Sequence, residues 1–118
     1  MTGPLPLSGL VVVEIGTSVA APTAAQIFAE LGAEVFKIEN PAGGDDARSW
    51  GPPFVDGVAA MFVAINRNKR SVAIDLKDNE QRDALRRFIL ARADIVLQNL
   101  RAANCPRELS PPGSRKSP

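Results

Sequence analysis

A glycine-bounded apolar run near the N-terminus is the feature that most constrains the fold of this chain. The run Leu10–Ile15 reads LVVVEI, with Gly9 before it and Gly16 after it. A nearly continuous β-branched run of this length is typical of a strand in a parallel sheet, because helices cover both faces of such a strand. We therefore expect a buried parallel strand here.

The residues that follow predict one strand–helix–strand unit. Pro22 suits the first turn of a helix, where its missing N–H costs nothing, and Gly32 is well placed to end that helix as the C′ residue. Between them, apolar side chains recur at helical spacing at Ala24, Ile27, Phe28 and Leu31. Glu34–Glu39 then alternates between charged and apolar residues, which predicts a second strand. The crossover between the two strands should be right-handed.

Asn40–Gly57 is rich in glycine and proline and is predicted to be a loop. It contains Asp45, Asp46, Arg48 and Trp50, for which two interpretations are open. The loop could be an active-site or interface flap, as long loops in compact domains often are. Alternatively, it could be a solvated turn in which Asp45 or Asp46 pairs with Arg48.

The second half of the chain predicts two more strands and two helices. Val58–Ile65 is apolar and suits a short helix, and Ser71–Leu76 alternates as a third strand. Asp78 and Gln81 resemble a capping box at the start of a longer helix. That helix should turn Leu85, Phe88 and Ile89 inward, and Ile95–Leu97 forms a fourth strand that ends at Gln98 and Asn99. The fold class is α/β, Rossmann-like, with a mostly parallel sheet.

The helical and strand patterns stop near residue 101. Residues 102–118 are rich in proline and serine and are predicted to be a disordered tail behind a single domain at 1–101. Because a doubly wound sheet with four strands is incomplete, we expect the chain to be a truncated form of a longer protein.

Composition excludes several classes of function. A net charge of +1 and the absence of tyrosine argue against nucleic-acid binding. Apolar runs such as Leu10–Val13 and Val58–Ile65 are too short to cross a membrane. The single cysteine, Cys105, cannot form an internal disulfide, which fits a cytoplasmic location. The chain has no histidine, which excludes histidine zinc sites and Ser-His triads, and no metal site is predicted.

Asn66–Lys77 concentrates positive charge around the third predicted strand. It carries Arg67, Lys69, Arg70 and Lys77 against the single acid Asp75. Cations fixed on a rigid element suit an anionic, phosphate-bearing ligand. The alternative is a solvated group of cations that shields a sheet edge. Asp75 could be a catalytic carboxylate, but its cationic neighbours favour an ion pair.

The first strand–helix turn, Gly16–Pro22, lacks the glycine pattern of dinucleotide-binding proteins. Gly16 is the only glycine where G-x-G-x-x-G is required, so NAD and FAD are disfavoured. The turn either points helix N-terminal N–H groups at a ligand or is a plain strand–helix connection.

Five segments follow one another along the chain: Gly9–Glu14, Leu31–Pro41, Gly43–Asp45 with Arg48, Asn66–Ser71 with Asp75–Lys77, and Ala93–Asn99. Together they resemble the N-terminal part of the class III CoA-transferases, which include formyl-CoA and carnitine CoA-transferases and the alpha-methylacyl-CoA racemases. The resemblance covers roughly Pro6 to Arg101.

The resemblance implies a domain that holds the ADP end of coenzyme A, with acyl-CoA and a small carboxylic acid as substrates. It implies no covalently bound cofactor and interlocked homodimers. The implied CoA contacts are Val19, Ala20, Asn40, Ile74, Asp75, Leu76, Lys77, Asn99 and Leu100. Lys77 would lie near the phosphates.

The resemblance assigns no catalytic residue to this chain. In the transferases, an aspartate downstream of the matched segment attacks the thioester, and the racemases place their His and Asp downstream as well. We therefore expect a CoA-transferase by family whose isolated 118-residue chain is inactive. The alternatives are a non-catalytic CoA-binding remnant, a truncated inactive product, or a racemase within the family.

Overall fold

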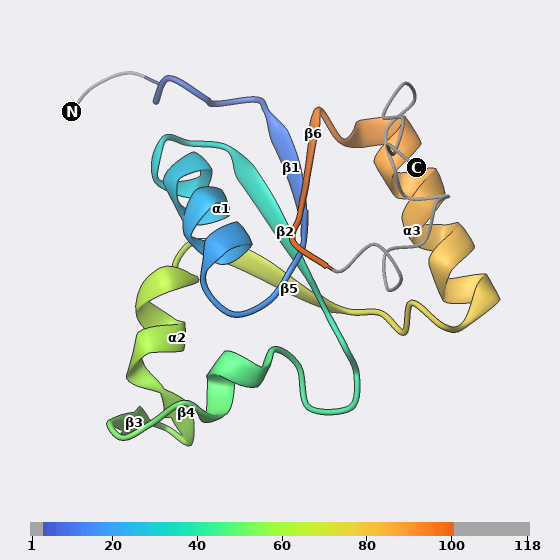
Figure 1. Ribbon diagram of the computed structural model, residues 1–118. Coiled ribbons are helices and arrows are strands. Elements are labelled where there is room, and N and C mark those ends of the chain that lie inside the picture. Colours follow the sequence, from blue (N-terminus) through green and yellow to red (C-terminus); the bar gives the residue numbers. More distant parts are fainter. Residues whose placement is uncertain (1–3, 101–118) are drawn as a thin grey trace, which may run out of the picture.

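A four-stranded parallel sheet runs through the computed structural model, which describes residues 4–100 (Figure 1). Its strands are β1 (Val11–Ile15), β2 (Glu34–Glu39), β5 (Lys69–Ala73) and β6 (Ile95–Gln98), in the spatial order β5-β2-β1-β6. This is the strand order with which a doubly wound sheet begins. The order in which strands are added to the sheet reverses between β1 and β6, although all four strands are parallel. The predicted α/β class with a mostly parallel sheet is confirmed.

Helices cover the two faces of this sheet (Figure 1). The helix α1 (Ala20–Glu30) packs on one face, where Ala25 and Ala29 meet Val12 and Val35. The helix α3 (Asn79–Arg92) packs on the other face through the predicted inward residues. Its Leu85, Phe88 and Ile89 contact Val13, Ile15 and Ile38. The apolar core is therefore divided into two layers by the sheet.

Gly32 ends α1 as predicted. Its φ is +105°, a conformation that glycine adopts without steric cost. A Cβ at this position would lie 2.7 Å from Leu5 Cβ, so the N-terminal segment also needs a glycine there.

The segment between β2 and β5 is more ordered than the predicted loop. It contains the 3₁₀ helix η1 (Asp46–Ser49), a hairpin of β3 (Phe54–Val55) and β4 (Val58–Ala59), and the helix α2 (Ala60–Ile65). The two turn residues of the hairpin, Asp56 and Gly57, both have positive φ, as a type I′ turn requires. The predicted helix over Val58–Ile65 therefore begins two residues late, because Val58 and Ala59 pair with β3.

The third predicted strand, Ser71–Leu76, is shifted in the structure. Pairing with β2 begins at Lys69 and ends at Ala73, opposite Glu39, the last residue of β2. Ile74 N–H makes one more hydrogen bond, to Glu39 O at 2.9 Å, and the chain then turns away. The alternating pattern misled because Ile74 and Leu76 remain packed against the α3 layer beyond the end of the strand.

The predicted capping box of α3 forms only in part. Asp78 Oδ1 accepts hydrogen bonds from the N–H groups of Glu80 and Gln81, at 2.9 and 3.1 Å, as an N-cap should. Gln81, however, accepts from the N–H of Asp75, at 2.9 Å, and not from Asp78 itself. The Gln81 side chain therefore links α3 to the loop after β5 and does not complete the capping box.

No helix formed by residues 4–100 is both long and apolar enough to cross a membrane. The predicted tail at 102–118, which includes Cys105, lies outside the described residues.

Candidate functional site

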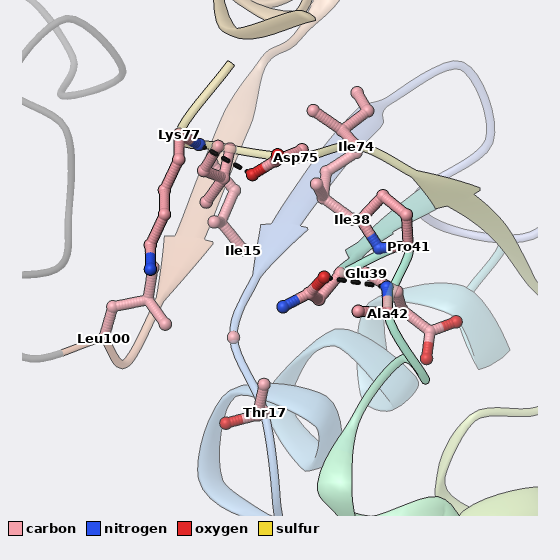
Figure 2. Close-up of a pocket in the computed structure, with 13 residues that line it drawn as sticks. Ile15, Thr17, Ile38, Glu39, Pro41, Ala42, Ile74, Asp75, Lys77 and Leu100 are labelled. Carbon is pink, nitrogen blue, oxygen red and sulfur yellow. Dashed lines mark hydrogen bonds between the residues drawn. The ribbon is translucent and has the colours of Figure 1, made fainter.

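A pocket of about 690 Å³ opens at the carboxyl ends of the parallel strands (Figure 2). Each strand supplies part of its wall through the residues at or just after its end. These are Ile15–Thr17, Ile38–Ala42, Ile74–Lys77 and Leu100. The carboxyl edge of a doubly wound sheet, near its switch point, is where such folds bind ligands, and the volume suits a small organic molecule.

The structure brings together most of the predicted contact residues. Asn40, Ile74, Asp75, Leu76, Lys77 and Leu100 all line the pocket. Val19, Ala20 and Asn99 are not among its lining residues: Val19 and Ala20 lie at the start of α1, and Asn99 holds the neighbouring turn.

Two loops contribute polar side chains to the pocket wall. After β2, Asn40 Oδ1 accepts a hydrogen bond from Ala42 N–H at 2.9 Å. After β5, Asp75 Oδ1 accepts from Lys77 N–H at 2.9 Å. The Lys77 side chain runs along one wall toward Leu100 (Figure 2), and it is the only lysine or arginine among the described residues that line the pocket.

The floor of the pocket includes the turn between β1 and α1, and side chains hold this turn from two directions. From the β6 side, Asn99 Oδ1 accepts from Thr17 N–H at 3.0 Å, and Asn99 Nδ2 donates to Thr17 O at 2.9 Å. From the other side, Lys37 Nζ donates to Gly16 O at 3.3 Å, and Asp45 Oδ1 accepts from Ser18 N–H at 3.1 Å. We call Gly16–Ser18 the β1–α1 turn.

A buried charge network lies beneath that turn, on the α1 face of the sheet. Glu14 Oε2 lies 2.7 Å from Lys37 Nζ, and Glu14 Oε1 lies 2.7 Å from Lys69 Nζ. Lys37 also faces Asp45 Oδ2 at 3.0 Å. All four side chains are at most 2% exposed. Burial lowers the pKa of Lys69 and outweighs the opposing effect of its bond to Glu14.

Glu39 forms a second buried centre next to the pocket. It accepts hydrogen bonds from Arg48 Nε at 2.8 Å and Arg48 Nη2 at 2.7 Å, from Asp45 N–H at 3.0 Å, and from the hydroxyl of Ser71. Burial alone would raise the pKa of Glu39, but the hydrogen bonds and the charge of Arg48 together lower it to about 2. The same pairing raises the pKa of Arg48. Glu39 is therefore a charged structural residue whose positive partner is adjacent.

The basic block Asn66–Lys77 does not act as one anion site. Arg67 and Arg70 reach Glu30 and Glu34, at 2.7 and 3.8 Å, and Lys69 is buried against Glu14. The interpretation of this block as one binding site for a phosphate-bearing ligand is wrong because β5 lies within the block. Lys69 is at the amino end of that strand and Lys77 lies beyond its carboxyl end, so only Lys77 reaches the pocket.

Both interpretations of the acidic loop miss the role of Asp45. Asp45 is buried, caps η1 by accepting from Ala47 N–H at 3.0 Å, and pairs with Lys37. The solvated-turn interpretation is wrong because Arg48 pairs with Glu39 instead. A signal for this network was present in the sequence: Glu14 and Lys37 are charged residues within apolar strands, and they lie directly opposite each other in the β1–β2 register.

Residues 4–100 contain no cluster of three histidine, cysteine or acidic side chains arranged to hold a metal ion. The candidate site consists of the pocket, with Lys77 on its wall and the β1–α1 turn at one side.

A family model described as CoA-transferase family III matches residues 7–109. The chain belongs to this family.

Relatives and solved structures agree with the family assignment. Over 102 residues the chain is 46% identical to the succinate–glutarate CoA-transferase of Agrobacterium fabrum, a match that covers 81% of this chain and 25% of that protein. It is 37% identical over 94 residues to the human succinyl-CoA:glutarate CoA-transferase, covering 80% of this chain and 21% of that protein. A crystal structure of a CAIB/BAIF family protein from Brucella suis superposes with a TM-score of 0.78 at 44% identity, covering 86% of this chain and 27% of that one.

The chain therefore spans about a quarter of the length of these family members. The resemblance seen in the sequence is confirmed at the level of the family and the fold.

Proposed function

We propose that the pocket binds the nucleotide end of coenzyme A. In this proposal the chain acts in a transferase that moves CoA from an acyl-CoA to a small carboxylic acid. The observation that carries this proposal is the convergence of four strand ends on one pocket with Lys77 on its wall. The apolar side chains Ile15, Ile38 and Ile74 suit the flat faces of an adenine ring, and a lysine beside them suits its phosphates.

The electrostatics of the pocket favour an anion at Lys77. Of the two acids that line the pocket, Glu39 is paired with Arg48, and Asp75 Oδ1 accepts a hydrogen bond from Lys77 N–H. Lys77 is exposed, so its charge is available to a ligand. A phosphate beside it would gain a charge-assisted hydrogen bond.

Three of the described acids, Glu14, Asp45 and Glu39, are poorly suited to act as a nucleophile. Glu14 and Asp45 are buried in ion pairs, and Glu39 is held by Arg48 and Ser71. The residues of this chain hold and orient CoA in the proposal. The carboxylate that attacks the thioester, which the family resemblance implies, is assigned to none of them.

Transfer is favoured over racemisation because the relatives described above are CoA-transferases. The names of these relatives specify succinyl-CoA, succinate and glutarate, so we favour small dicarboxylic acids as the acceptors of CoA. The homodimer and the cytoplasmic location implied earlier remain predictions. Sedimentation of the purified chain tests the former, and cell fractionation tests the latter.

Calorimetric titration of the full chain with CoA tests the binding proposal. Wild-type chain should bind CoA, and Lys77→Gln should weaken binding about fivefold to twentyfold. Arg70→Gln is the matched control, because Arg70 belongs to the same basic block but lies at the other end of β5. Absence of binding by the wild-type chain, or equal losses in the two variants, would contradict the proposal.

Transfer itself is tested separately. The chain is incubated with succinyl-CoA and glutarate, and glutaryl-CoA is sought by mass spectrometry. Formation of glutaryl-CoA would show that the chain is a transferase on its own. Binding without transfer would indicate a CoA-binding part that lacks the reactive carboxylate.

A further inference from the structure

The β1–α1 turn contains two peptide units, and both ends of each unit are bonded to side chains. In the peptide unit between Gly16 and Thr17, Gly16 C=O accepts a hydrogen bond from Lys37, and Thr17 N–H donates one to Asn99. In the peptide unit between Thr17 and Ser18, Thr17 C=O accepts a hydrogen bond from Asn99, and Ser18 N–H donates one to Asp45. Three side chains from three different segments therefore fix the orientation of both units.

This arrangement has two structural costs. Ser18 has φ of +71°, which is unfavourable for any residue except glycine. At Gly16, a Cβ would lie 2.5 Å from Asn99 Oδ1, so the close approach of Asn99 requires a glycine. A turn of this shape needs surrounding contacts to keep it in place.

We infer that Asn99 and Asp45 are positioning residues that hold the β1–α1 turn in its pocket-forming shape before any ligand enters. Asn99 then acts on the ligand through Thr17, not by touching it, which differs from the direct contact implied by the family resemblance. Gly16 and Thr17 line the pocket, whereas Asn99 does not. Where this turn is mobile, only the fraction of molecules with the correct turn binds, and the apparent dissociation constant rises accordingly.

The effect on CoA rests on the proposed function, so the experiment has two arms. In the first, hydrogen exchange of backbone amides is followed by NMR in the full chain without ligand. Asn99→Ala should speed exchange at Thr17 N–H by about fivefold or more, while Ser18 N–H, which Asp45 still holds, changes less. Unchanged exchange at Thr17 would overturn the inference.

In the second arm, CoA affinity is measured by calorimetry. Asn99→Ala should weaken binding about fivefold to tenfold, at a temperature where both proteins are folded. Asn99→Asp keeps the acceptor for Thr17 N–H but loses the donor to Thr17 O, so it should restore at most part of the affinity.

Asp94→Ala is the matched control. Asp94 Oδ2 accepts from Val11 N–H at 2.9 Å and thus bridges the same two strands at their amino ends, away from the pocket. This variant should lose stability but keep the wild-type affinity for CoA.

The outcomes separate the two proposals. If wild-type chain binds CoA and Asn99→Ala binds equally well, the positioning role is wrong and the proposed function stands. The positioning role is also wrong if Asp94→Ala loses as much affinity as Asn99→Ala. If the wild-type chain does not bind CoA, the proposed function fails, and the exchange rates at Thr17 decide whether Asn99 holds the turn.

Discussion

Lys37 and Glu14 form an ion pair of 2.7 Å across adjacent strands at the centre of the sheet, and both side chains are at most 1% exposed. Two further charges complete the network, since Lys69 pairs with Glu14 and Asp45 pairs with Lys37. With two acids and two lysines, the buried group is neutral. Loss of any one member would leave an uncompensated charge in a low-dielectric layer.

Lys37→Met should therefore be strongly destabilising. We expect a loss of about 3–5 kcal/mol in the free energy of unfolding, because Asp45 would lose its cation and Glu14 one of two. Urea denaturation measures this loss. Arg67→Ala is the control, since its pair with Glu30 is exposed and should be worth less than about 1 kcal/mol. Similar losses in the two variants would show that the network contributes little.

Glu39 should make the stability of the chain sensitive to acid. Its pKa is lowered to about 2 in the folded chain from 4.5, so its contribution is fully present above pH 5 and is lost as the pH falls toward 2. Glu39→Gln should remove a component on the order of 2 kcal/mol from the pH dependence of unfolding in this range.

Carboxyl chemical shifts followed by NMR give the pKa of Glu39 directly. Ser71→Ala removes one of the hydrogen bonds that lower this pKa and should move the titration to higher pH. A wild-type Glu39 that titrates at or above 4.5 would contradict the assignment.

Gly16→Ala should destabilise the chain by about 1–3 kcal/mol. The added Cβ would lie 2.5 Å from Asn99 Oδ1 and 2.6 Å from Ala21 Cβ. In the double variant with Asn99→Ala, only the contact with Ala21 remains, so the two losses should be less than additive. Gly43→Ala is the contrasting variant, because Gly43 has positive φ and open space around it, whereas Gly16 does not have positive φ and is crowded. Thermal unfolding of the wild type, the two single variants, the double variant and Gly43→Ala tests this. Strict additivity would show that Asn99 is not what crowds Gly16.

The strand–helix–strand unit was predictable because its signals are local. The apolar run of β1, Pro22 and Gly32 all act within a few residues. The apolar face predicted for α1 is wrong, however, because Ile27 and Leu31 are exposed and Ala25 and Ala29 are buried instead. The hairpin was missed although Asp56-Gly57 is a strong turn signal, because each of its strands has only two residues. The end of β5 was misplaced because strand length depends on the partner strand, which ends at Glu39.

The candidate site was only partly predictable for a similar reason. The pocket residues follow the ends of strands, so the order of the elements places Asn40, Lys77 and Leu100 together. Whether Lys69 is buried or reaches the pocket depends on Glu14, which is 55 residues away in the sequence. It also depends on which face of the sheet each side chain occupies. Pairing of charges across strands depends on register, and register is a property of the assembled sheet.

The two faces of the sheet should respond differently to mutation over evolutionary time. On the α3 face, apolar residues such as Val13 and Ile38 can be exchanged one at a time for others of similar volume. On the α1 face, Glu14, Lys37, Asp45 and Lys69 form a closed set in which every single neutral replacement leaves a buried charge unbalanced. Change within this set must come in compensated pairs, whereas the apolar residues on both faces of the sheet can change one at a time.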